Sequence, residues 1–346
     1  MPFYFTTFSR KKKGVICIFQ KASKKKRNAL RSRLCLLAVL SLCLTACKQA
    51  ETAKTEQFFA MDTAVTLTLP KADDGASRRT LEQLSGMLDC YAADSETAKL
   101  NAAGTLACSE DLTGLMRNTL ALEQRFGSSV QLTGGAVTTL WGVTTDHPQV
   151  PDAKSLAEAC RTVNDGGIRI EDAQVTLPAG AKLDFGAVAK GYALDVLRTQ
   201  WDAADYAYGI ASMHSSILLY GNKPDGKPFS VQIQKPDGTG MLGTVSTESC
   251  FVATSGGYER YFEADGVRYC HIFDLQTGRP VTSDLTTVTV FAETGLMADY
   301  LSTLIYLEGR EALPKHLAAK DYKLVAADTD GKLYRSDGLA FTEASS

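Results

Sequence analysis

The chain has 346 residues, of which 45% are hydrophobic and 22% are charged, with 37 Lys or Arg against 39 Asp or Glu. Eleven of the basic residues and none of the acidic ones lie within residues 1–46, so the rest of the chain carries a net charge of about −13. A surface this acidic argues against binding to DNA, RNA or anionic lipid headgroups. The chain is long enough to bury a sizeable core in one large domain or two small ones.

The basic N-terminal segment runs into a short apolar stretch, residues 34–46 (LCLLAVLSLCLTA), which ends directly before Cys47. This stretch is shorter than the roughly 20 residues that a membrane-spanning helix needs, and it suits the apolar region of a signal peptide. Residues 44–47 (LTAC) resemble a bacterial lipobox, whose Cys is lipidated. We therefore expect a lipoprotein signal peptide over residues 1–46, lipidation at Cys47 and a polar tether over residues 47–56. A plain secretory signal peptide remains the alternative.

These features predict a protein held by its lipid on the extracytoplasmic face of the cell membrane. The folded domain is then expected over residues 57–346. Five cysteines remain in it without CxxC spacing, so the sequence indicates neither a zinc site nor a disulfide framework.

The first predicted elements of this domain are a strand and two helical segments. Alternating apolar residues over 65–69 predict a strand that Pro70 ends. Helical periodicity follows over residues 77–101 and again over 109–127, with Ser109 as the N-cap of the second segment.

The second half of the domain is richer in strands. Residues 175–204 predict a strand, a Gly-containing turn and a helix beginning near Ala187 or Val188, and residues 206–254 predict several strands. A β-branched strand over 285–293 precedes a helix over 297–306, and a hairpin turn is expected at residues 328–331. Because strands and helices are segregated, the pattern indicates an α+β fold.

The helix over residues 297–306 (MADYLSTLIY) carries Asp299 and Thr303 four positions apart, so their side chains project from one face. A carboxylate and a hydroxyl at this separation can bind one hard cation such as Mg²⁺, which prefers oxygen ligands. A structural pairing remains open, in which Asp299 interacts with the helix dipole and Thr303 bonds back to its own turn.

Two further segments place polar side chains at predicted turns. Asp184 and Lys190 flank the start of a helix, where free backbone N–H groups and a Lys can bind phosphate oxygens. Thr254 and Ser255 precede His271, a residue type that acts as a general base near neutral pH. A solvated Lys190 and a purely structural His271 remain the alternatives.

Seven segments together resemble the ApbE family, the FAD:protein FMN transferases, many of which are periplasmic or surface lipoproteins. They occur in the family's order between residues 58 and 313. The segments are AMDTAVTLTL (60–69), ADSETAKLN (93–101), TLWG (139–142), DFGAVAKGYALD (184–195), ATSGGYERYF (253–262), HIFDLQTGRP (271–280) and ADYLST (298–303).

The resemblance implies a T-fold-like α+β architecture, with mixed antiparallel sheets and packed helices, that holds FAD as substrate in a cleft. It implies a Mg²⁺ site made by Asp299, Thr303 and a backbone carbonyl near Ala187. The implied flavin-binding residues are Met61, Asn101, Asp184, Lys190, Thr254, Ser255 and His271.

The same resemblance implies the reaction. His271 would take the proton of a Thr or Ser hydroxyl on an acceptor protein, such as an electron-transfer subunit. That oxygen would attack the FMN phosphorus and AMP would leave, with Lys190 assisting.

The chain departs from the family where Gly-Gly-Asn or Gly-Gly-Asp is expected, because residues 214–216 read His-Ser-Ser. Side chains then stand where backbone was expected to approach the ligand. Two alternatives to the transferase therefore remain open, an FAD pyrophosphatase that releases FMN and AMP, and a non-catalytic lipoprotein that binds flavin or a partner. Trp141 is expected in the core, and His147 and His316 on the surface.

Overall fold

The computed structural model describes residues 53–344. The predicted signal peptide and the lipidation site Cys47 lie outside these residues, as does the predicted tether up to residue 52. Residues 54–56, also expected in the tether, instead begin the first strand, because they pair with the neighbouring strand. No helix in the described part of the chain is long and apolar enough to cross a membrane.

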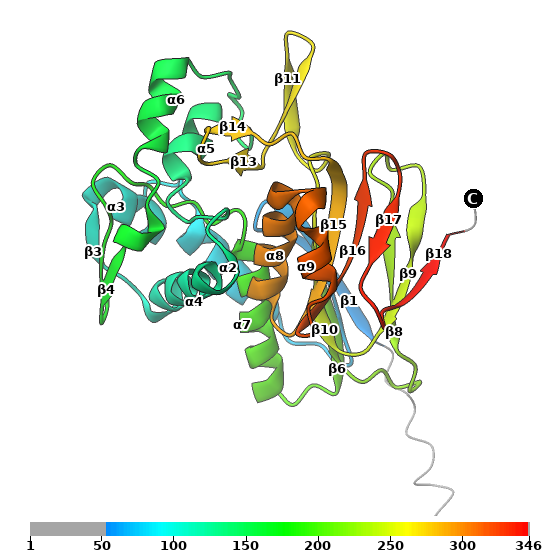
Figure 1. Ribbon diagram of the computed structural model, residues 1–346. Helices are drawn as coiled ribbons and strands as arrows, with labels where there is room; N and C mark the ends of the chain where they lie inside the picture. The colour runs from blue at the N-terminus through cyan, green and yellow to red at the C-terminus, as the bar shows by residue number, and fades with distance from the viewer. Residues whose placement is uncertain (1–52, 345–346) are drawn as a thin grey trace, which may run out of the picture. The chain divides into compact units, whose positions relative to one another are not determined.

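An eight-stranded sheet, antiparallel at every pairing, forms the centre of the domain (Figure 1). On strand β2 the alternating residues Val65, Leu67 and Leu69 are buried in the main core, as predicted. In sheet order the strands are β1 (Lys54–Ala60), β2 (Thr63–Leu69), β6 (Tyr208–Met213), β7 (Ser216–Gly221), β10 (Cys250–Ser255), β15 (Leu285–Ala292), β16 (Tyr322–Asp328) and β17 (Leu333–Arg335).

A second sheet, with strand order β18-β9-β8, packs its apolar residues against part of the central sheet. Its strands are β8 (Phe229–Gln234), β9 (Met241–Thr247) and β18 (Ala340–Glu343). Phe229 and Val245 from this sheet meet Leu219, Val252 and Phe291 from the central one. Strand β15 is therefore buried on both faces, which explains its almost continuous β-branched and apolar sequence.

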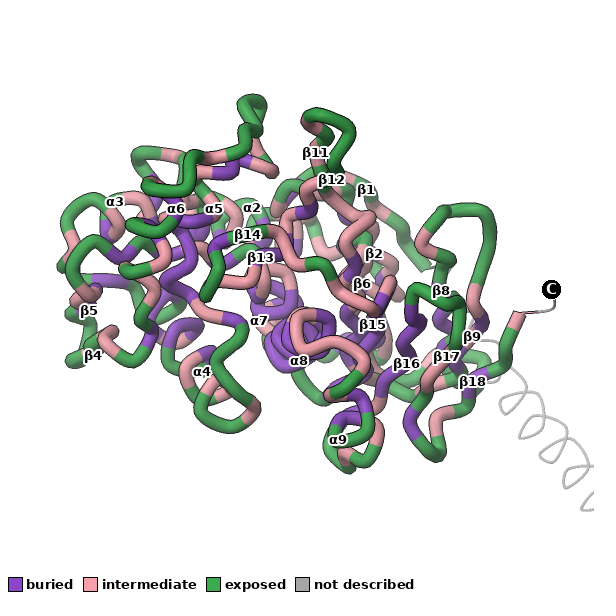
Figure 2. Tube along the Cα trace, turned by 45° about the horizontal axis from the view of Figure 1, so that its top comes forward, coloured by how far each residue is buried: buried purple, intermediate pink, exposed green. Residues whose placement is uncertain are grey.

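Helices α7 (Ala189–Ala203) and α8 (Gly295–Glu308) pack on the central sheet and on each other. Helix α8 is buried on nearly all sides (Figure 2), as expected of a helix that is apolar all round. Its N-terminus is capped by the Thr294 hydroxyl, which accepts from Met297 N at 3.2 Å. The Asp195 carboxylate of α7 also accepts from Gly295 N at 2.7 Å and Leu296 N at 2.9 Å.

The two helices approach most closely at Gly191 and Gly295, where a Cβ on Gly191 would lie 2.1 Å from the Gly295 carbonyl oxygen. We expect Gly191→Ala to lower the free energy of unfolding by about 3 kcal/mol, because the helices must move apart. Urea denaturation measures this. The matched control is Gly114→Ala in helix α4, where an added Cβ meets no atom within 4 Å. Equal stabilities of the two variants would contradict the close crossing.

A lobe made largely of helices stands beside the sheet in Figure 1. Trp141 lies in its core as predicted, 1% exposed, and its Nε1 donates to Gly278 O at 2.7 Å. The remaining helices of the domain are α2 (Ala76–Leu88), α3 (Glu96–Ala103), α4 (Glu110–Phe126), α5 (Gly135–Trp141), α6 (Ala153–Cys160) and η1 (Asp165–Gly167), with η2 (Arg310–Ala312) and α9 (Leu313–Leu317) following α8. The remaining strands of the domain are short: β3 (Thr105–Ala107), β4 (Arg169–Glu171), β5 (Gln174–Thr176), β11 (Tyr261–Ala264), β12 (Val267–Cys270), β13 (Phe273–Asp274) and β14 (Arg279–Pro280).

The predicted α+β class is confirmed, and so are several local features. Ser109 caps α4 by accepting from Leu112 N, and α7 begins at Ala189, close to the expected start. The prediction that His316 lies on the surface is wrong, since the residue is 3% exposed. Its Nε2 lies 2.7 Å from Glu308 Oε2 and its Nδ1 lies 2.6 Å from the Tyr322 hydroxyl, which compensates the buried imidazole.

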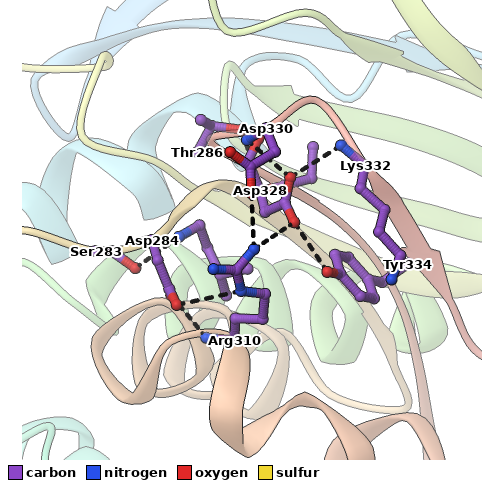
Figure 3. Close-up of polar contacts among 10 residues, drawn as sticks. Ser283, Asp284, Thr286, Arg310, Asp328, Asp330, Lys332 and Tyr334 are labelled. Carbon is purple, nitrogen blue, oxygen red and sulfur yellow. Dashed lines mark hydrogen bonds and ion pairs between the residues drawn. The ribbon is translucent and has the colours of Figure 1, made fainter.

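The predicted hairpin turn at residues 328–331 joins β16 to β17 and is held by a buried carboxylate (Figure 3). Asp328 accepts from Asp330 N and Lys332 N, each at 2.9 Å, and from the Tyr334 hydroxyl at 2.8 Å. Arg310, just beyond α8, pairs with the same carboxylate at 3.1 Å. The hairpin is therefore fixed to the C-terminal end of α8.

Candidate functional site

A cleft of about 290 Å³ lies against α8 and the start of α7. The fold brings turns from distant parts of the sequence together around it. The lining residues come from the β1–β2 turn (61–63), the end of α2 and the loop after it (88–91), the segment 129–134, the turn into α7 (184–190), the β6–β7 turn (214–215), the end of β10 and the segment after it (254–260), the segment 271–275, and positions 299 and 303 of α8.

Asp299 is a buried carboxylate at the base of the cleft, 6% exposed. Its Oδ1 accepts from Ser216 Oγ at 2.7 Å and its Oδ2 accepts from Gly191 N at 2.6 Å. Burial raises the pKa of Asp299, while the positive charge of Lys190 and these two hydrogen bonds oppose the rise. An ionised Asp299 thus needs a positive charge close by.

Thr303 lies one turn further along α8 and faces the same cleft. Its Oγ1 is 3.1 Å from Ser255 Oγ, which is also 2.8 Å from Ser302 Oγ. Thr254 in turn bonds Thr289 across the sheet at 2.9 Å. The bond of Thr303 therefore runs to Ser255 of β10 rather than back to its own turn.

Lys190 lies in the first turn of α7, half-buried, and lines the cleft. Its positive charge lowers the pKa of both Asp299 and His271, so it is electrostatically coupled to these two groups. Ala187, whose carbonyl was predicted as a metal ligand, lines the cleft three residues earlier. The cationic group, the carboxylate and the turn backbone are thus gathered at one place.

His271 lines the cleft and is held by the Arg260 carbonyl, which lies 3.1 Å from both its backbone N and its Nδ1. A carbonyl oxygen only accepts, so Nδ1 carries the proton and Nε2 of the neutral ring keeps a free lone pair. Burial lowers the pKa of His271 to about 4; the bond to Arg260 opposes this shift, and the charges of Lys190 and Arg260 add to it. The imidazole is therefore neutral at pH 7 and can accept a proton.

Asp184 lines the cleft, and both of its carboxylate oxygens are hydrogen-bonded. Its Oδ1 accepts from Gly186 N at 2.7 Å, and its Oδ2 accepts from Thr138 Oγ1 at 2.6 Å. Asn101, predicted as a flavin contact, does not line the cleft. Its side chain instead bonds both the N and the O of Leu183, at 2.6 and 2.9 Å, so it holds the backbone next to Asp184.

Met61 enters the cleft from a two-residue hairpin turn in which both Met61 and Asp62 have φ of 53°. Such turns favour Asn-Gly, because few other residues adopt the left-handed conformation without strain. Two contacts hold this turn: Met61 N donates to Ser85 Oγ at 3.2 Å, and Asp62 O accepts from Arg260 Nη2 at 2.7 Å. Strained backbone of this kind is common at functional sites.

Sequence reasoning missed Thr138 and Arg260 of the site, and it noted Ser216 only as part of the departure at residues 214–216. Ser216 and Thr138 bond site carboxylates from remote elements, and no local pattern signals such contacts. Arg260 could have been found, since it lies within the matched segment ATSGGYERYF at residues 253–262. His214, noted only as a departure, lines the cleft as well.

Comparison with known proteins places the chain in one family. Residues 61–327 match the model of the ApbE family. A Treponema pallidum protein named FAD:protein FMN transferase is 32% identical over 252 residues, covering 67% of this chain and 70% of its own. A Vibrio cholerae protein of the same name is 28% identical over 245 residues, covering 67% and 72%. The crystal structure of the ApbE protein from Thermotoga maritima matches with a TM-score of 0.76 at 26% identity, covering 82% of this chain and 97% of that one. The chain therefore belongs to the ApbE family.

Proposed function

We propose that the protein transfers FMN from FAD to a Thr or Ser hydroxyl of an extracytoplasmic acceptor protein, in a Mg²⁺-dependent reaction that releases AMP. The observation that carries this proposal is the meeting of Asp299, Thr303, Lys190 and His271 in one cleft. These groups supply what cleavage of a pyrophosphate needs, which is neutralisation of the phosphate charge and a proton acceptor in the same cleft. The name of the relatives from Treponema pallidum and Vibrio cholerae, FAD:protein FMN transferase, supports the transfer of FMN from FAD to a protein.

The residues present fit a Mg²⁺ ion. Asp299, Thr303 and the Ala187 carbonyl offer only oxygen donors, and Mg²⁺ in phosphate-transferring sites is held by one or two carboxylates together with substrate phosphates. Residues 53–344 hold no cluster of three or more His, Cys, Asp or Glu side chains that could bind a metal without such help. When bound, the ion would neutralise negative charge on the phosphate oxygens.

His271 is the proposed proton acceptor. Its Nε2, left unprotonated by the Nδ1–H bond to Arg260, takes the proton of the acceptor hydroxyl. The hydroxyl oxygen forms a new bond to the FMN phosphorus, the bond from that phosphorus to the bridging oxygen breaks, and AMP leaves with that oxygen. Lys190 stabilises the negative charge that develops during this exchange.

The other cleft residues are proposed to bind and orient the nucleotide. Met61, Asp184, Thr254 and Ser255 are the proposed flavin contacts, since each lines the cleft. Asn101 is proposed to act only indirectly, through the backbone beside Asp184.

The proposed location is the extracytoplasmic face of the cell membrane, reached through a signal peptide over residues 1–46 and a lipid on Cys47. Its support is the order of basic segment, apolar stretch and terminal Cys. An acceptor on the same side of the membrane, such as an electron-transfer subunit, is the proposed partner.

The test is incubation of the purified protein with FAD, MgCl₂ and an acceptor domain that carries a Thr target. We expect the acceptor to gain the mass of FMN, with release of AMP in equal amount, and we expect EDTA to abolish both products until Mg²⁺ is restored. Intact-mass spectrometry and nucleotide chromatography measure the two products. AMP without labelled acceptor would indicate a pyrophosphatase, and FAD binding without either product would indicate a non-catalytic flavin-binding protein.

A further inference from the structure

The β6–β7 turn places a histidine at a position that favours glycine. His214 has φ of 60°, whereas Ser215, the second residue of this two-residue turn, is not left-handed. A left-handed first position in such a hairpin is normally filled by glycine, which has no Cβ to strain. Residues kept in this conformation without being glycine are held by their surroundings and gather at functional sites.

His214 contacts the side chain of Glu259 beside the cleft. Its Nε2 lies 3.0 Å from Oε2 of Glu259, and both residues line the cleft. Glu259 is the better buried of the two side chains. The turn is further tied to β10 by the Ser215 carbonyl, which accepts from Thr254 N at 2.9 Å.

The residue after Glu259 holds the proposed base. The Arg260 carbonyl accepts from both N and Nδ1 of His271, each at 3.1 Å. The Arg260 side chain donates to Asp62 O at 2.7 Å, so the β1–β2 turn anchors this residue from the other side. Residues 259–260 thus lie between two strained turns, one that contacts Glu259 and one that contacts Arg260.

We infer that His214 and Glu259 are positioning residues for His271. Their contact fixes the backbone of residues 259–260, and this backbone sets the position of the carbonyl that selects the Nδ1–H tautomer of His271. The inference rests on the proposed function for the role of His271 as a base. The tautomer of His271 follows from the structure alone.

The first experiment compares FMN transfer by Glu259→Ala, Glu259→Gln and His214→Gly. We expect Glu259→Ala to lower kcat by about tenfold or more with little change in KM for FAD, because a misplaced base slows the chemical step. Glu259→Gln keeps a side chain of the same length with an oxygen that can lie beside His214 Nε2, and should recover most of the rate. His214→Gly should lose rate as Glu259→Ala does, yet unfold at an equal or higher temperature because the left-handed strain is relieved.

A double variant and a matched control make the test sharper. Combining His214→Gly with Glu259→Ala should cost no more rate than either change alone, since both remove the same contact. Glu248→Ala, an exposed acid in the β9–β10 turn that does not line the cleft, should leave the rate unchanged. Additive losses, equal loss in Glu259→Gln, or an effect confined to KM would overturn the positioning role.

The second experiment does not depend on transferase activity. Nitrogen-15 NMR of the ligand-free protein reports which ring nitrogen of His271 carries the proton, with the signals assigned by His271→Gln. We expect the Nδ1–H form in the unsubstituted protein and a mixture of both tautomers in Glu259→Ala. The same tautomer in both proteins would overturn the inference, even if the transferase proposal itself held. If the unsubstituted protein failed to transfer FMN, this measurement would still decide the inference.

Discussion

The Asp299→Asn protein is expected to lose FMN transfer by about 10³-fold or more while unfolding at the same temperature as the unsubstituted protein, or a higher one. Asn keeps the shape of the side chain and one acceptor oxygen for Gly191 N, and the Ser216 hydroxyl can turn to accept from the new amide. Removing the charge also removes the cost of burying an ionised carboxylate, which is the cost that raises the pKa of Asp299. Function and stability should thus separate, which a purely structural carboxylate could not produce.

The comparison uses initial rates of acceptor labelling at saturating Mg²⁺, with thermal unfolding of the same samples. Asp195→Asn is the matched control, because Asp195 is a partly buried carboxylate between α7 and α8 that caps the N-terminus of α8 and does not line the cleft. That variant should lose about 1 kcal/mol of stability and keep its transfer rate. Labelling by Asp299→Asn at the unsubstituted rate would rule Asp299 out of the cation site.

Local patterns in the sequence predict a good part of this fold. The apolar alternation of β2 and the turn between β16 and β17 each follow from a few neighbouring residues. Helical periodicity alone also places Asp299 and Thr303 on one face of α8, and both line the cleft. These features depend on side-chain period and turn chemistry, which act over short distances.

The contacts between elements could not be predicted in the same way. The bond from Ser216 to Asp299 joins residues 83 positions apart, and the close approach of Gly191 to Gly295 depends on how two helices cross. Asn101 shows the same limit, because its motif indicated a polar residue near the flavin but not that its amide would bind Leu183. Motif matching recovers which residues gather, whereas packing decides what each one touches.

The burial of His271 has a consequence for stability as well as for catalysis. Its pKa is lowered to about 4 in the folded protein, against about 6.5 for a solvated imidazole. Between pH 4 and pH 6.5 the imidazole of residue 271 binds a proton in the unfolded chain but not in the folded protein. The stability that the neutral His271 contributes is therefore complete above about pH 6.5 and is lost as the pH falls toward 4. From pH 8 to pH 5 the loss should reach up to about 2 kcal/mol.

The His271→Gln protein is expected to lose this pH dependence together with FMN transfer, which should fall by about 10² to 10⁴-fold because no general base remains. Urea unfolding of both proteins at pH 8 and pH 5 measures the first effect, and single-turnover labelling at saturating FAD measures the second. The buried His316, whose pKa is also lowered by burial, contributes equally to both proteins and cancels in the comparison. His147→Gln, an exposed site outside the cleft, is the control for both measurements. A variant that kept the full pH dependence would show that His271 is solvated in the folded protein, and one that kept its rate would show that another group accepts the hydroxyl proton.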